Sequence, residues 1–209
     1  MPRLMAALYD SVLGVAERRG LARWRAEVLA PLHGRVLEIG AGTGLNLPYY
    51  PRTVTELVLA EPDRHMRARL ARQAAVAPVP VTISDAPASP LPFADASFDG
   101  VVMTLVLCTI ADVPGALGEA RRILRRGGTL AFLEHVGAEE GSRRLRWQRR
   151  MEPLWRPLAG NCHLTRRTVD EIRAAQFTVR LVRSDDLPGL LRLGSPVVRG
   201  IATPSAGGG

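Results

Sequence analysis

The sequence contains no lysine, so arginine alone supplies its 28 basic residues, against 20 acidic ones. The formal net charge of +8 indicates an anionic partner, such as a membrane surface, a nucleic acid or an acidic substrate. Solubility alone is the alternative explanation for this charge.

Cysteine and long apolar runs are also scarce. Cys108 and Cys162 form neither a disulfide framework nor a zinc-binding spacing, so we expect reduced, buried thiols and no metal. No apolar stretch reaches the roughly 18 residues that span a bilayer. Arg18 and Arg19 follow the apolar part of the N-terminus, the reverse of a secretory signal, and we therefore expect a cytoplasmic protein.

Short apolar runs alternate with helical patterns along most of the chain. A single domain over residues 1–203 accommodates them, with 204–209 as a flexible tail. Strands are predicted at 35–39, 57–60, 79–84, 98–107, 129–134, 177–182 and 197–202. Helices are predicted at 3–18, 21–30, 63–75, 112–126, 142–158 and 168–176. This alternation predicts an α/β fold with a doubly wound, mainly parallel sheet of seven strands.

Residues 1–30 are expected to form an amphipathic helical lid, whose first helix ends at Gly20. Its second helix should direct one pair of side chains into the protein and another into solvent. The inward pair is Trp24 and Val28, and the outward pair is Arg23 and Arg25.

Local signals predict several other helix ends. The pair Gly127–Gly128 should cap the helix over 112–126. Thr168 and Glu171 should form a capping box. Pro153 and Pro157 should break or kink the helix in which they lie.

The run Val36–Gly44, VLEIGAGTG, ends an apolar strand in a carboxylate and continues into a glycine-rich turn. Glycines at 40, 42 and 44 allow positive φ and leave room for a ligand at the backbone. At the carboxyl end of a parallel strand, the N–H groups of such a turn can hold a polar cofactor. The spacing G-x-G-x-G departs from the dinucleotide fingerprint G-x-G-x-x-G, so a dehydrogenase is the weaker alternative.

Later strands also end in residues that suit a nucleoside-like ligand. Glu61 ends the second strand, where it can accept hydrogen bonds from both ribose hydroxyls. Asp85 ends the third strand, where it can accept from an exocyclic amine such as adenine N6, and Thr104 and Leu105 lie near the end of the fourth. Because ligands bind beyond the carboxyl ends of parallel strands, we expect these residues to surround one ligand.

The pattern E-x-G-x-G-x-G at Glu38–Gly44 resembles motif I of the class I S-adenosylmethionine-dependent methyltransferases. Phe98–Val102 and Arg122–Gly128 resemble two later motifs, so the likeness covers roughly residues 30–135. It implies a Rossmann-like fold, S-adenosyl-L-methionine as cofactor and S-adenosyl-L-homocysteine as product. The cofactor-binding residues that it implies are Glu38, Gly40, Ala41, Gly42, Gly44, Asn46, Glu61, Pro62, Asp85, Ala86, Thr104 and Leu105.

A nucleic-acid acceptor is not favoured. Enzymes that methylate exocyclic amines of bases usually carry D/N-P-P-Y/F after the fourth strand, where this chain has Thr104–Cys108. The sequence also carries no obvious RNA-binding module. The basic residues therefore indicate a different anionic partner, with solubility alone still the alternative.

The region 142–176 is expected to cover the site, and its first helix is both basic and apolar. An arginine-rich side with tryptophan at its margin is typical of a helix at a membrane interface. The arginines are Arg143, Arg144, Arg146, Arg149 and Arg150, and the apolar residues are Trp147, Met151, Leu154, Trp155 and Leu158. An ordinary surface helix that packs over the sheet is the alternative.

Two related families supply expectations about the methyl acceptor. Leu8–Asp10 and Leu45–Tyr50 resemble bacterial phospholipid N-methyltransferases, which convert phosphatidylethanolamine stepwise to phosphatidylcholine. Thr104–Thr109, Glu134–Val136 and Trp147–Arg166 are similar to the membrane-associated alkyl thiol methyltransferases. We expect phospholipid methylation by a peripheral protein at the anionic inner membrane surface. S-methylation of small alkyl thiols is the alternative, and other acceptors rank lower.

The amine acceptor suggests roles for particular side chains. Tyr9 can close over the site and contact the ammonium group or the cofactor. Glu134 and His135 end the fifth strand, and His135 and His163 are candidate bases because histidine titrates near neutral pH. For a thiol acceptor, a nearby arginine or histidine would stabilise the thiolate. Candidate substrate-binding residues are Tyr9, Arg146, Trp147, Arg149, Trp155 and Arg166, the arginines for a lipid phosphate and the tryptophans for the acyl entrance.

Overall fold

The computed structural model describes residues 14, 16–187 and 194–205, which form a sheet in the order β3-β2-β1-β4-β5-β7-β6. The strands are β1 (Gly34–Ile39), β2 (Val54–Ala60), β3 (Val81–Ser84), β4 (Phe98–Thr104), β5 (Leu124–His135), β6 (Phe177–Asp186) and β7 (Pro196–Pro204). The strands from β3 to β5 pair in parallel, whereas β7 is antiparallel to both β5 and β6. The predicted seven-stranded, mainly parallel sheet is confirmed.

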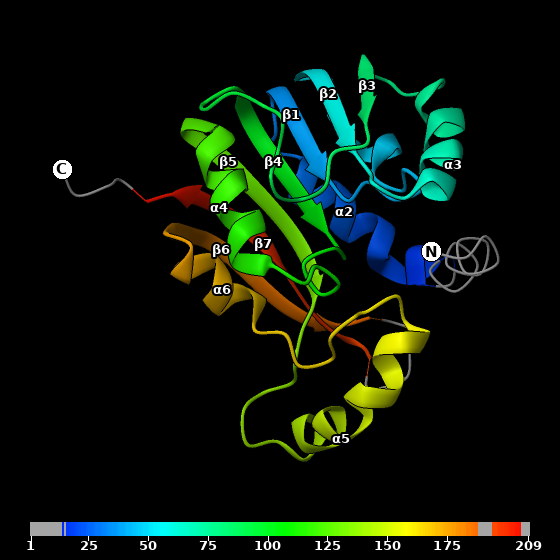
Figure 1. Cartoon of the computed structure of the whole chain (residues 1–209), viewed down its shortest axis with the longest axis vertical. Coiled ribbons are helices and arrows are strands. Elements are labelled where there is room, and N and C mark those ends of the chain that lie inside the picture. Colours follow the sequence, from blue (N-terminus) through cyan, green and yellow to red (C-terminus); the bar gives the residue numbers. More distant parts are fainter. Residues whose placement is uncertain (1–13, 15, 188–193, 206–209) are drawn as a thin grey trace.

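Helices lie on both faces of the sheet, and α5 lies beyond the carboxyl ends of the central strands (Figure 1). The helical elements are the π-helical turn η1 (Glu17–Leu21), α2 (Ala22–Leu29), the short turn η2 (Leu47–Tyr49), α3 (Arg64–Ala74), α4 (Val113–Ile123), α5 (Arg143–Leu158) and α6 (Thr168–Ala174). This arrangement leaves the glycine-rich loop after β1 at the same edge of the sheet as α5.

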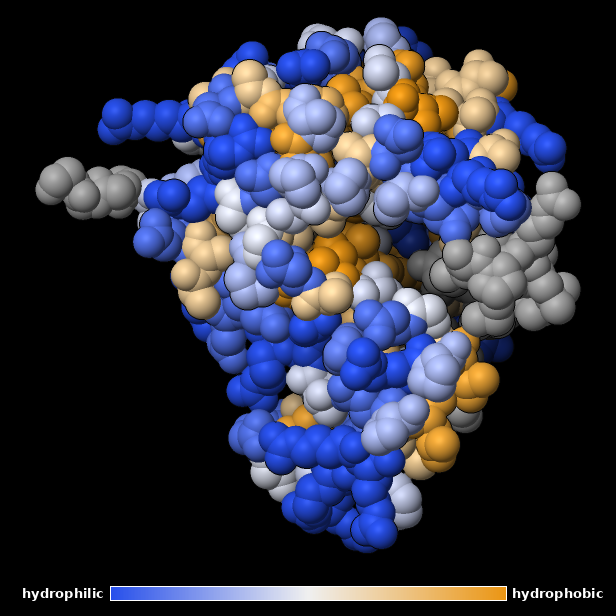
Figure 2. All heavy atoms as spheres, in the orientation of Figure 1, coloured by the Kyte–Doolittle hydropathy of each residue, from blue (hydrophilic) through white to orange (hydrophobic). Residues whose placement is uncertain are grey.

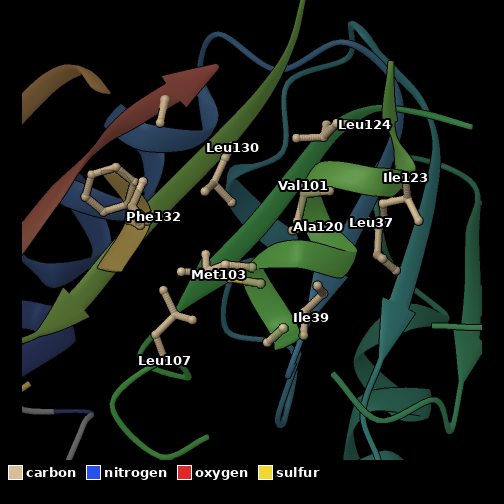
Figure 3. Close-up of a cluster of buried hydrophobic side chains, with 14 of the residues drawn as sticks. Leu37, Ile39, Val101, Met103, Leu107, Ala120, Ile123, Leu124, Leu130 and Phe132 are labelled. Atoms are coloured by element: carbon tan, nitrogen blue, oxygen red, sulfur yellow. The ribbon is translucent and has the colours of Figure 1, made fainter. Parts of the chain in front are cut away.

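Alternate side chains of the central strands build two separate cores. Leu37 and Ile39 of β1 lie in the core beneath α4 and α6, together with Met103 and Phe132 (Figure 3). Val36 points to the opposite face, where the helices α2 and α3 cover the sheet. Because a strand turns successive side chains to opposite faces, β1 is apolar in both directions, as a central parallel strand must be.

The expected cap at Gly127–Gly128 is wrong. Helix α4 ends at Ile123, and Leu124 already has an extended backbone, with φ −70° and ψ 133°. Leu124 pairs with Phe98 of β4, so the chain enters the sheet before it reaches the glycines. Sheet pairing of an apolar residue therefore ends this helix earlier than its glycine signal suggests.

The predicted capping box also fails. Arg167 occupies the N-cap of α6 without a side-chain cap, and the buried Thr168 hydroxyl has no hydrogen-bond partner within the described chain, so the capping box is absent. Helix α5 continues through Pro153 and Pro157, so the prolines do not break it, and a kink there stays a prediction. Both prolines are exposed, so water can satisfy the carbonyl groups that lose their N–H partners.

The N-terminal lid is described only in part. Tyr9 and almost all of the helix predicted over 3–18 lie outside the described residues. Gly20, with φ 145° and ψ −18°, has a non-helical backbone and kinks the helical chain within η1. Trp24 and Val28 are buried and Arg23 is exposed, as expected.

Candidate cofactor and active site

The glycine-rich loop follows β1 at the carboxyl edge of the sheet. The Gly40 N–H donates to the Ala60 carbonyl oxygen at 2.8 Å, and the Gly42 N–H donates to Glu61 Oε2 at 2.8 Å. A Cβ on Gly40 would lie 2.3 Å from Val106 Cγ2, so packing closes this position. A Cβ on Gly42 would meet no atom within 4 Å, and its φ of +59° disfavours other residues. Gly42 therefore presents bare backbone to open space, where a ligand can approach.

Glu61 connects this loop to the loop that follows β2. Its second carboxylate oxygen, Oε1, accepts a hydrogen bond from the Asp63 N–H at 2.8 Å. Arg67 Nη1 donates to the carbonyl oxygens of Glu61 and Pro62 at 2.7 Å each and holds the turn. Burial raises the pKa of Glu61. Each carboxylate oxygen still has acceptor capacity, so Glu61 can accept further hydrogen bonds from ribose hydroxyls.

Glu38 lies at the centre of a buried polar cluster. Asn46 Nδ2 donates to Glu38 Oε1 at 2.8 Å, and the Tyr50 hydroxyl donates to Glu38 Oε2 at 2.7 Å. Asn46 Nδ2 also donates to Thr104 Oγ1 at 2.8 Å. Burial raises the pKa of Glu38 to about 7. The structure thus brings together three predicted cofactor residues, whose side chains tie β1, the glycine-rich loop and β4 to one another.

Arg25 belongs to the same cluster, and the expectation that it is exposed is wrong. Its side chain is buried, with Nη1 donating to Asn46 Oδ1 at 2.9 Å and to Thr104 Oγ1 at 3.4 Å. Its Nη2 lies 2.9 Å from Glu17 Oε1, so the guanidinium also has an acidic partner. Helical periodicity assigns an arginine beside Trp24 to solvent, but the long side chain can reach a buried acceptor on another element.

The predicted adenine contact, Asp85, lies at the edge of a groove. The groove has a volume of about 540 Å³ and is also lined by Arg67. It extends along the sheet to Arg35 and Glu56, near the starts of β1 and β2. Only its Asp85 end therefore reaches the carboxyl edge, and the neighbouring Ala86 is buried.

Glu134 holds the loop that follows β4. Its Oε1 accepts hydrogen bonds from the N–H groups of Val106 at 3.0 Å and Leu107 at 2.9 Å, and its Oε2 accepts from the Cys108 N–H at 3.3 Å. Burial raises the pKa of Glu134 to about 7. Leu105, at the start of this loop, has a φ of +54°. Glu134 therefore has a structural role, because it fixes the backbone of this loop. Its participation in catalysis stays a prediction.

The two candidate histidine bases have different surroundings. His135 is buried at the end of β5, and its Nδ1 lies 3.4 Å from Cys162 Sγ. Its Nε2 is buried and has no hydrogen-bond partner among the residues that the structure describes. His163 Nδ1 lies 3.1 Å from Glu152 Oε1 of α5. Among the described residues, His135 therefore has one nitrogen without a partner, whereas His163 is engaged with the helix.

The predicted phosphate-binding arginines make contacts within the protein. Arg166 Nη2 donates to the Ile110 carbonyl oxygen at 2.7 Å. Arg149 Nη2 lies 3.1 Å from Glu140 Oε1 at the surface, and Arg146 Nη1 donates to the Gly141 carbonyl oxygen at 3.0 Å. Each of the three therefore has a partner within the protein, and their binding of a lipid phosphate stays a prediction.

The exposed surface of α5 combines charge with apolar area. Trp147, Leu154 and Leu158 are 55%, 64% and 74% exposed, whereas Trp155 is half-buried. Figure 2 shows orange apolar atoms beside a largely hydrophilic surface at this end of the molecule. Within the described part of the chain, no helix has both the length and the apolar character needed to cross a membrane.

Comparisons with known proteins agree with this geometry. Residues 37–132 match the family model described as a methyltransferase domain. The chain is 31% identical over 170 residues to human thiol S-methyltransferase TMT1A, an alignment that covers 80% of this chain and 69% of that protein. The chain belongs to the class I S-adenosylmethionine-dependent methyltransferases.

Other relatives of this methyltransferase differ in their acceptors. Rattus norvegicus thiol S-methyltransferase TMT1B is 37% identical over 146 residues, 68% of this chain, and the chain spans only 59% of that relative's length. A phosphatidylethanolamine N-methyltransferase from Cereibacter sphaeroides is 30% identical over 138 residues, 65% of this chain and 66% of that protein. A putative methyltransferase structure from Bacillus halodurans superposes with a TM-score of 0.72 at 12% identity, covering 87% of this chain and 99% of that one, and confirms the fold.

The cofactor of this methyltransferase is S-adenosyl-L-methionine, and its product is S-adenosyl-L-homocysteine. The residues at the carboxyl edge fit it, because Gly42 offers uncovered backbone and Glu61 offers free acceptor capacity beside it. Asp85 lies at the end of the next strand along this edge. Their individual contacts with the cofactor stay predictions.

Three residues of the site were missed from the sequence. Arg25 and Tyr50 complete the cluster around Glu38, and Cys162 lies beside His135. A tyrosine twelve positions from its acceptor gives no local signal, because only the turn through η2 brings it back to β1. The sequence predicts that Cys162 is a buried thiol, but its side chain is only partly buried.

Proposed function

We propose that this methyltransferase transfers the methyl group of S-adenosylmethionine to the sulfur of small alkyl thiols. The relatives named thiol S-methyltransferases share 31% and 37% identity with the chain, more than the relative named a phosphatidylethanolamine N-methyltransferase, at 30%. These likenesses favour the thiol acceptor over the phospholipid acceptor that the sequence motifs first suggest.

The Nε2 of His135, which is buried and has no hydrogen-bond partner in the described part of the chain, carries this proposal. When bound, the cofactor supplies an electrophilic methyl group, and the attacking sulfur must be a thiolate. An alkyl thiol with a pKa near that of cysteine, about 8.5, is mostly protonated at neutral pH. With the His135 proton on Nδ1, directed to Cys162 Sγ at 3.4 Å, Nε2 carries a lone pair that can accept the thiol proton. The buried position of His135 keeps bulk water away from that nitrogen.

A phospholipid amine is the second candidate, because α5 has the composition of an interfacial helix. Its exposed Trp147, Leu154 and Leu158 can enter the headgroup region of a bilayer, while its arginines attract anionic lipid. Such contact would place the protein peripherally on the inner, cytoplasmic membrane surface. Membrane contact suits an apolar thiol acceptor as well as a lipid acceptor, since both kinds of molecule concentrate at a bilayer.

A side-by-side acceptor assay tests the proposal. Labelled S-adenosylmethionine is supplied with a short alkyl thiol, with vesicles of phosphatidylethanolamine and with vesicles of its monomethyl form. We expect label in the thioether and little in lipid. Turnover of either lipid above that of the thiol would overturn the proposal in favour of the second candidate. Label in neither acceptor, with S-adenosylhomocysteine binding intact, would exclude both.

A further inference from the structure

The only two cysteines of the chain meet at the active edge of the sheet. The His163 N–H donates to the Cys108 carbonyl oxygen at 2.8 Å, which fixes the segment after α5 against the loop after β4. The neighbouring Cys162 is therefore held beside that loop, where its thiol and that of Cys108 influence each other. Two thiols held on neighbouring segments that are 54 positions apart (162 − 108) can react as a pair.

The two thiols are chemically unequal. Cys162 is partly exposed, and His135 Nδ1 lies 3.4 Å from its sulfur, whereas Cys108 is buried. Hydrogen bonding from Cys108, and then from His135, lowers the pKa of Cys162, while the same thiol–thiol bond and burial raise that of Cys108. Cys162 is thus the more accessible and more acidic thiol, and Cys108 is its buried neighbour.

We propose that Cys162 is a thiol–disulfide exchange site for small-molecule disulfides, with Cys108 as its resolving thiol. The Cys162 thiolate attacks one sulfur of a disulfide RS–SR, forming a Cys162–SR mixed disulfide and releasing RS⁻. Cys108 then loses its proton and attacks Cys162 Sγ, forming the Cys108–Cys162 disulfide and releasing the second thiolate. Starting from the Cys162 thiolate and the Cys108 thiol, the protein gives up two electrons and one proton. With a second proton from solvent, the small disulfide is reduced to two thiols.

The disulfide links the loop after β4 to the segment after α5, and both flank His135. It also removes the thiolate that faces His135 Nδ1, so oxidation changes the surroundings of that imidazole. Disulfides of alkyl thiols are the oxidised form of the acceptor class proposed above. This chemical match rests on the proposed function, whereas the exchange reaction does not.

The native full chain is incubated with 2-hydroxyethyl disulfide, quenched in acid with a thiol alkylating agent, and analysed by intact mass and peptide mapping. We expect wild type to lose two hydrogens and to retain no alkylatable thiol. The Cys108→Ser variant should stop at one mixed disulfide on Cys162, and Cys162→Ser should leave Cys108 largely unmodified. Because mass is the readout, failure of methyl transfer to thiols leaves this result unaffected.

Three outcomes would overturn the proposal. One is a wild-type protein that reacts only after denaturation. Another is a stable wild-type mixed disulfide that never resolves to the internal bond. The third is a Cys162→Ser variant whose Cys108 reacts as fast as the wild-type protein. The wild-type arm decides the question even if one variant fails to fold.

Discussion

Arg25 Nη1 donates to Asn46 Oδ1 at 2.9 Å, and this buried hydrogen bond joins α2 to the glycine-rich loop. The same guanidinium pairs with Glu17 of η1, and the same amide donates to Glu38. The N-terminal helical segment and the loop that faces the cofactor therefore share one polar cluster. A substitution in the helical segment should therefore disturb the glycine-rich loop, and the reverse should also hold.

Arg25→Met should destabilise the protein strongly, because it leaves Glu17 and Asn46 without their buried partner. Breaking one side of a buried charge pair costs about 3 kcal/mol or more in free energy of unfolding. The matched control is Arg23→Met in the same helix, which is exposed and should change stability by no more than about 0.5 kcal/mol. Urea unfolding of both variants measures the difference, and equal losses would contradict the assigned role of Arg25.

Gly42→Ala should weaken cofactor binding more than it weakens the fold. A Cβ at this position meets no protein atom within 4 Å, but it enters the space assigned to the cofactor. The positive φ makes alanine cost about 1 kcal/mol of stability. Affinity for S-adenosylhomocysteine, measured by calorimetry, should fall at least about tenfold, since the added methyl group overlaps the ligand.

Gly127→Ala is the matched control, because Gly127 also has positive φ and open space around its Cβ position but lies near the start of β5, away from the carboxyl edge. It should lose similar stability and keep its affinity. Equal affinities of the two variants would show that Gly42 does not face the ligand.

Stability should fall as pH rises from about 4.5 to about 7, because burial raises the pKa values of Glu38 and Glu134 to about 7 from the ordinary 4.5. In this window the folded chain keeps protons that the unfolded chain has released, so rising pH favours unfolding. Glu38→Gln should reduce this decline, since the Tyr50 hydroxyl can donate or accept. Thermal unfolding across the pH range measures it, with the exposed Glu139→Gln as the control that leaves the slope unchanged.

Leu158→Ser should weaken binding to anionic vesicles if α5 enters the bilayer surface. Leu158 is 74% exposed on α5, and Val76, at 80% exposed, lies beyond the end of α3 and provides the control Val76→Ser. Vesicle sedimentation should show a loss for the first variant alone, and binding of wild type should weaken from about 0.1 M to about 1 M salt. Unchanged binding of Leu158→Ser would remove α5 from the contact.

The cofactor edge was predictable because its signals are local. Glu38, the glycines and Glu61 each follow an apolar run by one or two positions, and strand polarity alone places them at one edge. The start of β5 could not be predicted in this way. Leu124 pairs with Phe98 and so belongs to the strand, although its local sequence is typical of a helix.

The partners of buried side chains also could not be predicted from the sequence. Arg25 finds its acceptors 21 and 79 positions away, and Cys162 meets His135 27 positions away. Such pairs depend on how α2 and the segment after α5 pack against the sheet. Hydrophobic periodicity predicts which side of a helix is apolar, but it does not predict which group the end of a long side chain contacts.

The most direct test of the thiol proposal compares His135→Gln with wild type on two acceptors, an alkyl thiol and an aromatic thiol that is already ionised at neutral pH. Loss of a general base should lower turnover of the alkyl thiol about 100-fold and leave the aromatic thiol nearly unaffected. The exposed His33→Gln variant should match wild type on both. Equal losses on the two thiols, or wild-type turnover of the alkyl thiol by His135→Gln, would contradict the assignment of His135 as the base.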